Sequence, residues 1–524
     1  MGSWAGWRER GAGMLDRRPV RAVAALLAGA LPALAFPAPS LWWFAYVCLV
    51  PLLLLVRSAG SARGAARDAW LGGTGFMIAV HHWLMPSLHV FIVVLAALLG
   101  LLWAPWGVLA GRLLRGPVTG RSAVAAVVLV PCGWLMIELV RSWEGLGGPW
   151  GLLGASQWQV APALRLASVG GVWLVSLLVV AVNTALTVLL VHSAARAAAA
   201  VSLLVGALVV GAAWMWAPQP ERTGTARVAV VQPGIVAGPD SVERRFALGE
   251  ELTRSLAGRD VDLVVWGESS VGVDPARRTA TADRLAALSR AVGADLLVNV
   301  DARQTDAAGR TGIFKRAVLV GPGGLTGDRY DKMRLVPFGE YIPARAALGW
   351  ATSMGRAAGE DRLRGSGPVT MRVPGADGLR IGPLVCFESA FPDMSRRLVR
   401  DGAALLVAQS STSSFQHSWA PRQHASLGAL RAAESGRPVV HATLTGVSAV
   451  YGPRGEAVGA PLGTDSSGTA VYGVPLARGT TLYVRLGDWP VYGALGALAL
   501  FGAAEGVRAA RARRRTRPAA CEGV

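Results

Sequence analysis

The feature that most constrains this chain is a series of long apolar runs separated by clusters of arginine. A helix needs about 20 apolar residues to cross a bilayer, and several runs approach that length. The mean hydropathy of the whole chain, +0.41, agrees with this pattern. The chain is therefore predicted to be a membrane protein with about eight transmembrane helices, in the runs 22–36, 41–56, 69–85, 88–110, 123–140, 166–191, 197–216 and 489–507.

The arginine clusters predict how these helices are oriented. Cytoplasmic loops of membrane proteins carry an excess of Lys and Arg. Arginines precede the first apolar run, follow the second, fourth and sixth runs, and fill the C-terminal tail. A cytoplasmic N-terminus places all of these clusters inside the cell. Seven crossings then leave the segment after residue 216 outside, and the eighth returns the tail to the cytoplasm.

The net charge of +19 is assigned to this topology and to anionic lipid headgroups rather than to nucleic acid. The first run could instead be the apolar part of a signal peptide, because arginines precede it. A membrane helix is favoured, since a second apolar run follows at once. The expected organisation is a basic cytoplasmic N-terminus (1–21), a seven-helix membrane domain (22–216), an extracytoplasmic domain (217–488), a last transmembrane helix (489–507) and a basic cytoplasmic tail (508–524).

The segment between residues 217 and 488 has the pattern of a layered α/β fold. Helices are expected at 240–258, 279–292 and 421–436. In such folds functional groups gather where strands end. Strands are predicted at the apolar, β-branched stretches 227–231, 262–266, 296–300, 317–320, 380–386, 405–408 and 439–444.

One of these strands ends on a thiol, Cys386, with Pro392 soon after it. A polar group at the end of a strand is presented at the edge of a sheet, so Cys386 is a candidate nucleophile. A buried structural cysteine is the commoner fate of a lone thiol. The four cysteines show no CxxC spacing and no histidine at ligand distance, so neither a disulfide framework nor a metal site is predicted for Cys48, Cys132, Cys386 and Cys521.

Two other segments supply groups that could work with this thiol. Glu268 follows a fully apolar strand, and Lys332, one of two lysines in a chain rich in arginine, follows a glycine-rich turn. A glutamate can act as general base, a thiolate can hold an acyl group as a thioester, and an ammonium can stabilise the oxyanion. Glu268, Lys332 and Cys386 together predict acyl transfer without a metal or another cofactor.

These residues lie in recognisable motifs. Residues 266–268 (Trp-Gly-Glu), 330–332 (Tyr-Asp-Lys) and 386–388 (Cys-Phe-Glu) resemble the Glu-Lys-Cys motifs of the nitrilase superfamily. With membrane runs on both sides of this domain and the sequence of residues 335–343, the chain is similar to the apolipoprotein N-acyltransferases. The resemblance implies a membrane α-helical bundle plus an extracytoplasmic nitrilase-like α-β-β-α sandwich.

The resemblance also implies roles for individual residues. Glu268 would be the base, Lys332 the oxyanion partner and Cys386 the nucleophile. Glu340 would orient Lys332, and Trp150 would line the lipid entry. Further residues of the motifs, expected to support the site or bind substrate, are Tyr330, Phe338, Tyr341, Phe387 and Glu388.

The implied reaction moves an acyl chain from a phospholipid to the cysteine, and then to the α-amine of the diacylglyceryl-cysteine that begins a lipoprotein. The expected partners are the phospholipid donor, the diacylated apolipoprotein acceptor and membrane lipids. No cofactor, metal or nucleic acid is implied. The protein is expected to be a monomer in the bacterial plasma membrane. Two alternatives stay open, a membrane-tethered nitrilase-like amidase or hydrolase and a non-catalytic transporter or scaffold.

The sequence departs from the family pattern at three places. Gly267 stands where the family usually has proline, and Lys315 stands where it often has asparagine. Residues 410–415 read Ser-Ser-Thr-Ser-Ser-Phe in place of Asn-Asp-Ala-Trp-Phe-Gly. None of these changes removes a member of the triad. They bear on donor preference and on the mouth of the site.

Overall fold

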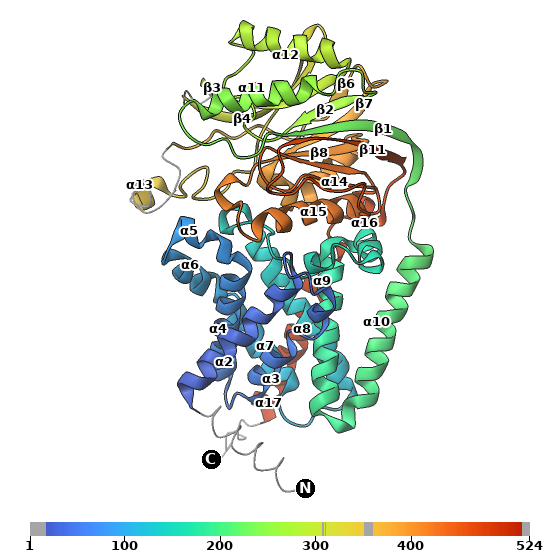
Figure 1. The fold of residues 1–524 in the computed structure, drawn as a ribbon. Helices are drawn as coiled ribbons and strands as arrows, with labels where there is room; N and C mark the ends of the chain where they lie inside the picture. Colours follow the sequence, from blue (N-terminus) through green and yellow to red (C-terminus); the bar gives the residue numbers. More distant parts are fainter. Residues whose placement is uncertain (1–16, 306–308, 310, 350–359, 516–524) are drawn as a thin grey trace, which may run out of the picture.

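The computed structural model describes residues 17–305, 309, 311–349 and 360–515. It consists of a helical bundle with an α/β domain stacked on one end of it (Figure 1). Most of the predicted basic N-terminus, the last part of the predicted tail and Cys521 lie outside the described residues.

Each of the eight predicted apolar runs is helical in the bundle or beside it. The second run begins as a 3-10 helix, and the fourth is divided into three short helices. The elements are α2 (Arg18–Ala30) with η1 (Leu31–Ala35), η2 (Trp42–Tyr46) with α3 (Val50–Ser58), α4 (Ala62–His81), α5 (Met85–Leu88), α6 (Phe91–Gly100), α7 (Trp103–Leu114), α8 (Gly120–Arg141), α9 (Ala161–Val191), α10 (Arg196–Trp216) and α17 (Trp489–Arg515).

Not all of these helices have the length and hydropathy of a membrane span. Within the described residues five do, and a sixth span is counted if α6 and α7, which meet at a 43° bend, are taken together. The helical stretch Trp42–Ser58 is too short for this test. Helix α4 carries Asp68, which is fully buried and paired with Arg21 at 2.7 Å. The predicted total of about eight spans therefore stays a prediction for the second and third runs.

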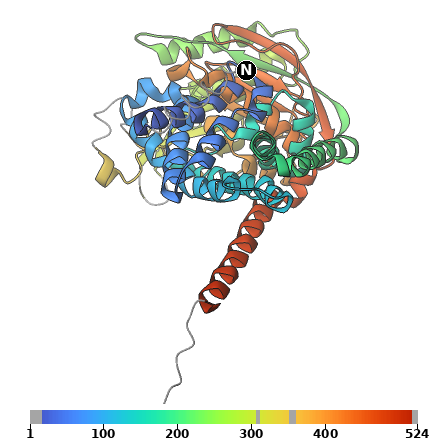
Figure 2. The same ribbon diagram turned by 90° about the horizontal axis from the view of Figure 1, so that it is seen from below.

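The start of α2 and the end of α17 lie at the end of the bundle away from the α/β domain (Figure 1). Arg21 at the start of α2 binds Asp68 near the start of α4. Arg112 near the end of α7 pairs with Glu505 near the end of α17. In the view from below, α17 extends outward from the rest of the bundle (Figure 2). Arg21 and Arg112 thus lie toward the end of the bundle away from the α/β domain.

The α/β domain contains two sheets. The six-stranded sheet has the order β11-β1-β2-β3-β4-β5, and the five-stranded sheet has the order β10-β9-β8-β7-β6. Parallel pairing runs through β1-β2-β3 and through β7-β8-β9. The strands are β1 (Glu221–Gln232), β2 (Leu263–Trp266), β3 (Asp295–Thr305), β4 (Thr311–Gly321), β5 (Gly324–Asp331), β6 (Met371–Val373), β7 (Leu379–Val385), β8 (Leu405–Ser410), β9 (Val439–Thr443), β10 (Ala449–Tyr451) and β11 (Gly468–Arg478).

Helices cover the outer faces of the two sheets. Helices α11 (Ser241–Arg254) and α12 (Thr279–Val292) lie on the six-stranded sheet, and α14 (Pro392–Arg400) and α15 (Ala420–Ser435) lie on the five-stranded sheet (Figure 1). This arrangement is the predicted α-β-β-α sandwich. All seven predicted strands and all three predicted helices are confirmed. The elements β5, β6, β10, β11, α13 (Arg345–Leu348), α14 and α16 (Leu482–Leu486) were not predicted.

Helix α15 joins the sandwich to the bundle. All its residues except Arg422 are buried, because it packs between the five-stranded sheet and α9. The carboxylate of Glu434 accepts a hydrogen bond from the backbone N–H of Val172 at 2.7 Å. Val172 follows Gly171, whose φ of +69° breaks the regular helix of α9. The freed N–H of α9 is therefore satisfied by the α/β domain.

Candidate active site

Cys386 lies at a sharp turn where β7 ends. Its φ is +52°, a left-handed conformation that is uncommon for residues other than glycine, and the 3-10 helix η8 (Cys386–Ala390) begins there. Such strain persists only where the surrounding structure holds it in place. Here Glu388 holds the turn, because its Oε2 accepts a hydrogen bond from the N–H of Val385 at 2.8 Å.

Glu388 also connects this turn to the segment that carries Lys332. Its Oε1 accepts hydrogen bonds from the Tyr330 hydroxyl at 2.7 Å and from the N–H groups of Met333 at 2.8 Å and Arg334 at 3.1 Å. Burial raises the pKa of the Glu388 carboxyl, and its hydrogen bonds oppose that rise. Glu388 and Tyr330, both predicted as supporting residues, thus form the brace between two parts of the site.

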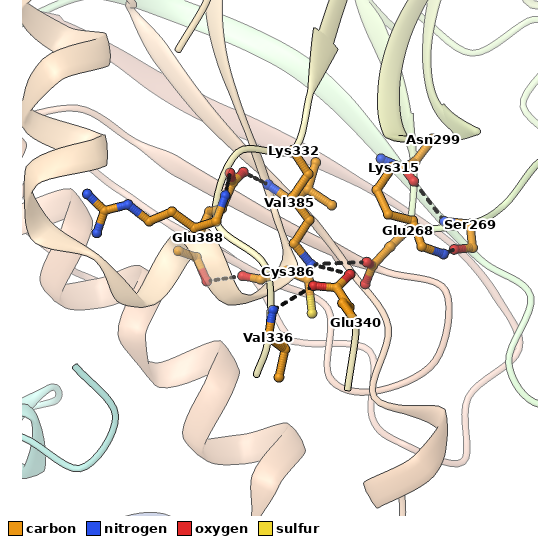
Figure 3. Close-up of polar contacts among 12 residues, drawn as sticks. Glu268, Ser269, Asn299, Lys315, Lys332, Val336, Glu340, Val385, Cys386 and Glu388 are labelled. Atoms are coloured by element: carbon orange, nitrogen blue, oxygen red, sulfur yellow. Dashed lines mark hydrogen bonds and ion pairs between the residues drawn. The ribbon is translucent and has the colours of Figure 1, made fainter. Parts of the chain in front are cut away.

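Lys332 is fully buried between two carboxylates (Figure 3). Its Nζ donates to Glu340 Oε1 at 2.9 Å and lies 3.5 Å from Glu268 Oε1. Burial lowers the pKa of Lys332, but the charges of Glu340 and Glu268 outweigh that effect, and the pKa is raised. The side chain is therefore an ammonium held in a place that water does not reach.

The thiol of Cys386 lies beside the same charges (Figure 3). Burial raises its pKa, the neighbouring charge of Glu268 raises it further, and Lys332 opposes both effects. A hydrogen bond between Cys386 and Glu268 also favours the protonated thiol. In the resting site the proton is on sulfur, next to the carboxylate that could accept it.

Glu340 is oriented by its own loop. Its Oε2 accepts a hydrogen bond from the N–H of Val336 at 2.8 Å. Phe338 has a φ of +62°, and its N–H donates to the carbonyl of Tyr341 at 2.7 Å. The guanidinium of Arg364 lies over the ring of Tyr341 at 5.1 Å. Phe338 and Tyr341 therefore form the turn that carries Glu340.

Glu268 is presented by a second strained turn. Ser269 has a φ of +55°, and its N–H donates to Asn299 Oδ1 at 2.9 Å. The ammonium of Lys315 contacts the hydroxyl of Ser269 and pairs with Asp301 Oδ1 at 2.8 Å. Sequence analysis missed Asn299 and Asp301. Both residues lie on β3, next to β2, the strand that ends before Glu268. Polar residues at alternate positions of this predicted strand were the signal by which the sequence could have identified them.

Gly267 is required by a close approach of two chain segments. A Cβ added there would lie 1.9 Å from the backbone nitrogen of Leu444, which follows β9. The same nitrogen donates to the carbonyl of Ser410, which also accepts from the N–H of Glu268 at 3.1 Å. In this chain the usual proline of the family would collide with the neighbouring strand end.

Trp150 is linked to the nucleophile through α15. It is 8% exposed, and its Nε1 donates to Gln423 Oε1 at 2.9 Å. Its ring lies 5.4 Å from that of His424, whose Nε2 is 3.0 Å from the carbonyl of Cys386. Phe387 packs on Phe391, with ring centroids 4.9 Å apart. A lipid-entry role for Trp150 stays a prediction.

His424 is a further residue that sequence analysis did not identify. Its Nε2 also lies 2.9 Å from the hydroxyl of Ser389, within the nucleophile turn. Burial lowers its pKa from 6.5 to about 4. The side chain is therefore a neutral imidazole that supports the turn. The described part of the chain contains no cluster of three or more side chains suited to bind a metal.

A buried thiol, ammonium and carboxylate pair at the strand ends of an α-β-β-α sandwich define a nitrilase-type domain. Residues 227–482 match the carbon-nitrogen hydrolase family, and residues 28–185 match the family described as the apolipoprotein N-acyltransferase N-terminal domain. The chain belongs to the apolipoprotein N-acyltransferase family.

Curated relatives with that name match along most of their length. The protein from Geobacter metallireducens is 30% identical over 485 residues, covering 88% of this chain and 91% of the relative. The protein from Pseudomonas aeruginosa is 32% identical over 507 residues, covering 91% and 94%. Among solved structures, an amidase from a Nesterenkonia species is 21% identical, with a TM-score of 0.34 and coverage of 49% of this chain and 93% of the amidase.

Proposed function

We propose that this protein is a phospholipid-dependent N-acyltransferase. It moves a fatty acyl chain, through a thioester on Cys386, to the α-amine of the N-terminal diacylglyceryl-cysteine of a lipoprotein. The relatives are named for this activity. The observation that carries the proposal is that buried Glu268 and Lys332 and the partly buried Cys386 meet in one site on top of a helical bundle with membrane-spanning character.

In the first half-reaction Glu268 accepts the thiol proton while sulfur attacks the carbonyl carbon of the donor ester. A carbon–sulfur bond forms, and the carbonyl oxygen becomes an oxyanion next to the Lys332 ammonium. Removal of one such donor typically slows a reaction by ~10²–10³. The ester carbon–oxygen bond then breaks. The departing lysophospholipid oxygen takes the proton from Glu268.

In the second half-reaction the acceptor amine attacks the thioester carbonyl and passes a proton to Glu268. The carbon–nitrogen bond forms, the carbon–sulfur bond breaks, and the Cys386 thiolate recovers the proton from Glu268. Lys332 remains an ammonium in both steps, which suits its raised pKa. The products are an amide-linked acyl chain and a regenerated enzyme.

The protein is a bacterial membrane protein, and we propose that it is multi-pass, with the α/β domain on the extracytoplasmic side. The start of α2, with Arg18 and Arg21, and the end of α17, with Arg508 and Arg511, lie at the end of the bundle opposite that domain (Figure 1). Soluble activated acyl carriers are cytoplasmic, so an outward-facing enzyme draws its donor from the membrane. A bilayer phospholipid meets this requirement. A monomer is the proposed assembly.

The two alternative functions fit the structure less well. A hydrolase of soluble amides needs one anchor rather than a bundle. For a transporter the carboxylates of interest within the bundle are Asp68, which pairs with Arg21, and Glu138, whose Oε1 accepts hydrogen bonds from Trp134 Nε1 at 3.0 Å and from the N–H of Leu153 at 2.6 Å. Glu138 is thus engaged in holding the segment that carries Trp150.

Incubation with a labelled phospholipid and a diacylated lipopeptide tests the proposal. The expected products are the N-acylated lipopeptide and a lysophospholipid, with neither formed by Cys386→Ala. If the wild type releases free fatty acid and forms no N-acylated lipopeptide, the protein is a hydrolase and the proposed transferase activity is wrong.

A further inference from the structure

A polar cavity of about 470 Å³ lies next to the triad, on the side of Glu268 and Glu340. Its volume falls in the usual range of small-ligand pockets, ~300–1,000 Å³. The reaction steps above use only the carboxylates at its edge. The remaining wall is formed mainly by charged and hydroxyl side chains, among them Arg245, Asp301, Lys315, Arg362, Ser411 and Ser413.

Two of the cations that line this cavity are not held in an ion pair among the described residues. Lys315 pairs with Asp301 at 2.8 Å, and Lys332 behind the wall pairs with Glu340 at 2.9 Å. Neither Arg245 nor Arg362 forms an ion pair with another residue that the structure describes.

The Nε atom of Arg245 is a second indication that the cavity binds a ligand. This atom is buried and has no hydrogen-bond partner among the described residues. A buried polar group of this kind costs free energy unless a ligand or water satisfies it. A guanidinium is well suited to bind the oxygens of a phosphate.

One wall of the cavity, formed by residues of α11, β3 and β4, lies on the side of the site away from the membrane helices, whereas Ser413 on another wall is two residues from Phe415. Arg245 is on α11, and Asp301 and Lys315 are on β3 and β4, whereas α15 rests on the bundle (Figure 1). Glu268 lies between Cys386 and the side chains of Ser269 and Lys315 (Figure 3).

The membrane side of the site is aromatic instead. The ring of Trp83 lies 5.3 Å from that of Trp150 and 4.8 Å from that of Phe415. A phospholipid raised from the bilayer trails its acyl chains toward the membrane and carries its headgroup beyond the ester carbonyl. With the ester at Cys386, the headgroup points away from the bundle.

We propose that this cavity binds the phosphodiester headgroup of the acyl donor, with Arg245 and Arg362 as the phosphate ligands. The inference rests on the proposed function and deepens it, because it names the group that distinguishes a phospholipid from other esters. The acceptor fits the cavity less well, since its α-amine is a cation and would lie against the guanidinium groups of Arg245 and Arg362.

The test compares two donors with identical acyl chains, a phosphatidylethanolamine and the corresponding diacylglycerol. The rate of thioester formation on Cys386 is followed by intact-protein mass spectrometry. Arg245→Gln is expected to slow acylation by the phospholipid about tenfold or more, as for loss of a charge-assisted hydrogen bond, and to leave acylation by the diacylglycerol unchanged. Arg254→Gln, an exposed arginine of the same helix, is expected to match the wild type with both donors.

Each other outcome overturns the assignment. Equal slowing with both donors would make Arg245 a structural residue. Normal thioester formation with slow transfer to the lipopeptide would assign the cavity to the acceptor. Inhibition by inorganic phosphate as strong as that by glycerophosphoethanolamine would mean a site for free phosphate rather than for the headgroup.

A binding measurement separates failure of this assignment from failure of the proposed function. Glycerophosphoethanolamine is titrated into the full-length Cys386→Ala protein by isothermal calorimetry, which requires no acyl transfer. Binding that Arg245→Gln weakens about tenfold or more supports the headgroup site even if no acyl-enzyme is found. Absent binding, or equal binding by both proteins, contradicts it.

Discussion

Lys332 Nζ lies 2.9 Å from Glu340 Oε1 and 3.5 Å from Glu268 Oε1, so one buried cation is shared unequally by two carboxylates. The shorter contact goes to Glu340, which is fixed by its own loop through Val336. Glu268 keeps the looser contact and a hydrogen bond with Cys386. The division leaves Glu268 able to accept a proton while Lys332 stays charged.

Removal of the second carboxylate should therefore impair the first. In Glu340→Gln the ammonium is left with Glu268 alone, which tightens that pair and makes Glu268 a weaker base toward the thiol. The rate of thioester formation is expected to fall by ~10² or more, the usual scale for losing a group that acts on the transition state. Time courses by intact-protein mass spectrometry measure it. Glu360→Gln, whose carboxylate pairs with Arg303 on the surface, is the control, and equal rates in the two variants would contradict this role.

Lys332→Arg should be inactive although the charge is kept. Lys332 is fully buried, and a planar guanidinium needs more room and aims its donors differently. Acylation is expected to be as slow as in Lys332→Met, ~10² or more below the wild type. Normal acylation by the arginine variant would show that charge alone is sufficient.

Gly267→Ala should destabilise the α/β domain, because the new Cβ would lie 1.9 Å from the nitrogen of Leu444. Overpacking of this kind typically costs ~1–3 kcal/mol. The midpoint of thermal unfolding in detergent is expected to fall by several degrees. Gly224→Ala is the matched control, since a Cβ there would meet nothing within 4 Å. Equal midpoints for the two variants would disprove the close approach.

His424 should make the folded state less stable in acid. Its pKa is lowered by burial from 6.5 to about 4, so the unfolded chain binds the proton more readily. The contribution of neutral His424 to the free energy of unfolding is complete above pH 6.5. It is lost as the pH falls toward 4, at about 1.4 kcal/mol per pH unit. In His424→Gln the fall in unfolding midpoint over this range should be smaller, with a remainder from the similarly buried His441. An unchanged slope would mean that His424 does not titrate in this way.

The sequence predicted the sandwich because its central strands are continuous apolar stretches with clear ends. Strands such as β5 and β11 were missed because glycine, proline and charged residues interrupt their apolar stretches. The bundle was predicted as a set of apolar runs. Breaks within the runs, such as the one between η2 and α3, decide which helices are long enough to span a membrane. Composition does not reveal these breaks.

The members of the candidate triad were found because each follows a predicted strand or turn. Their supports depend on contacts between distant segments. Glu388 bonds to residues 54 to 58 positions away in the chain, and His424 reaches the carbonyl of Cys386 from 38 positions away. The reason for glycine at position 267 is likewise a contact with Leu444. No local pattern encodes such distances.

The most direct test of the central claim is intact-protein mass spectrometry of wild type and Cys386→Ala after incubation with a defined phospholipid. The proposed mechanism predicts a mass increase of one acyl group in the wild type, removed by hydroxylamine and absent from the variant. An acyl group on Cys386→Ala, or turnover of the lipid by the wild type through a different residue, would contradict it.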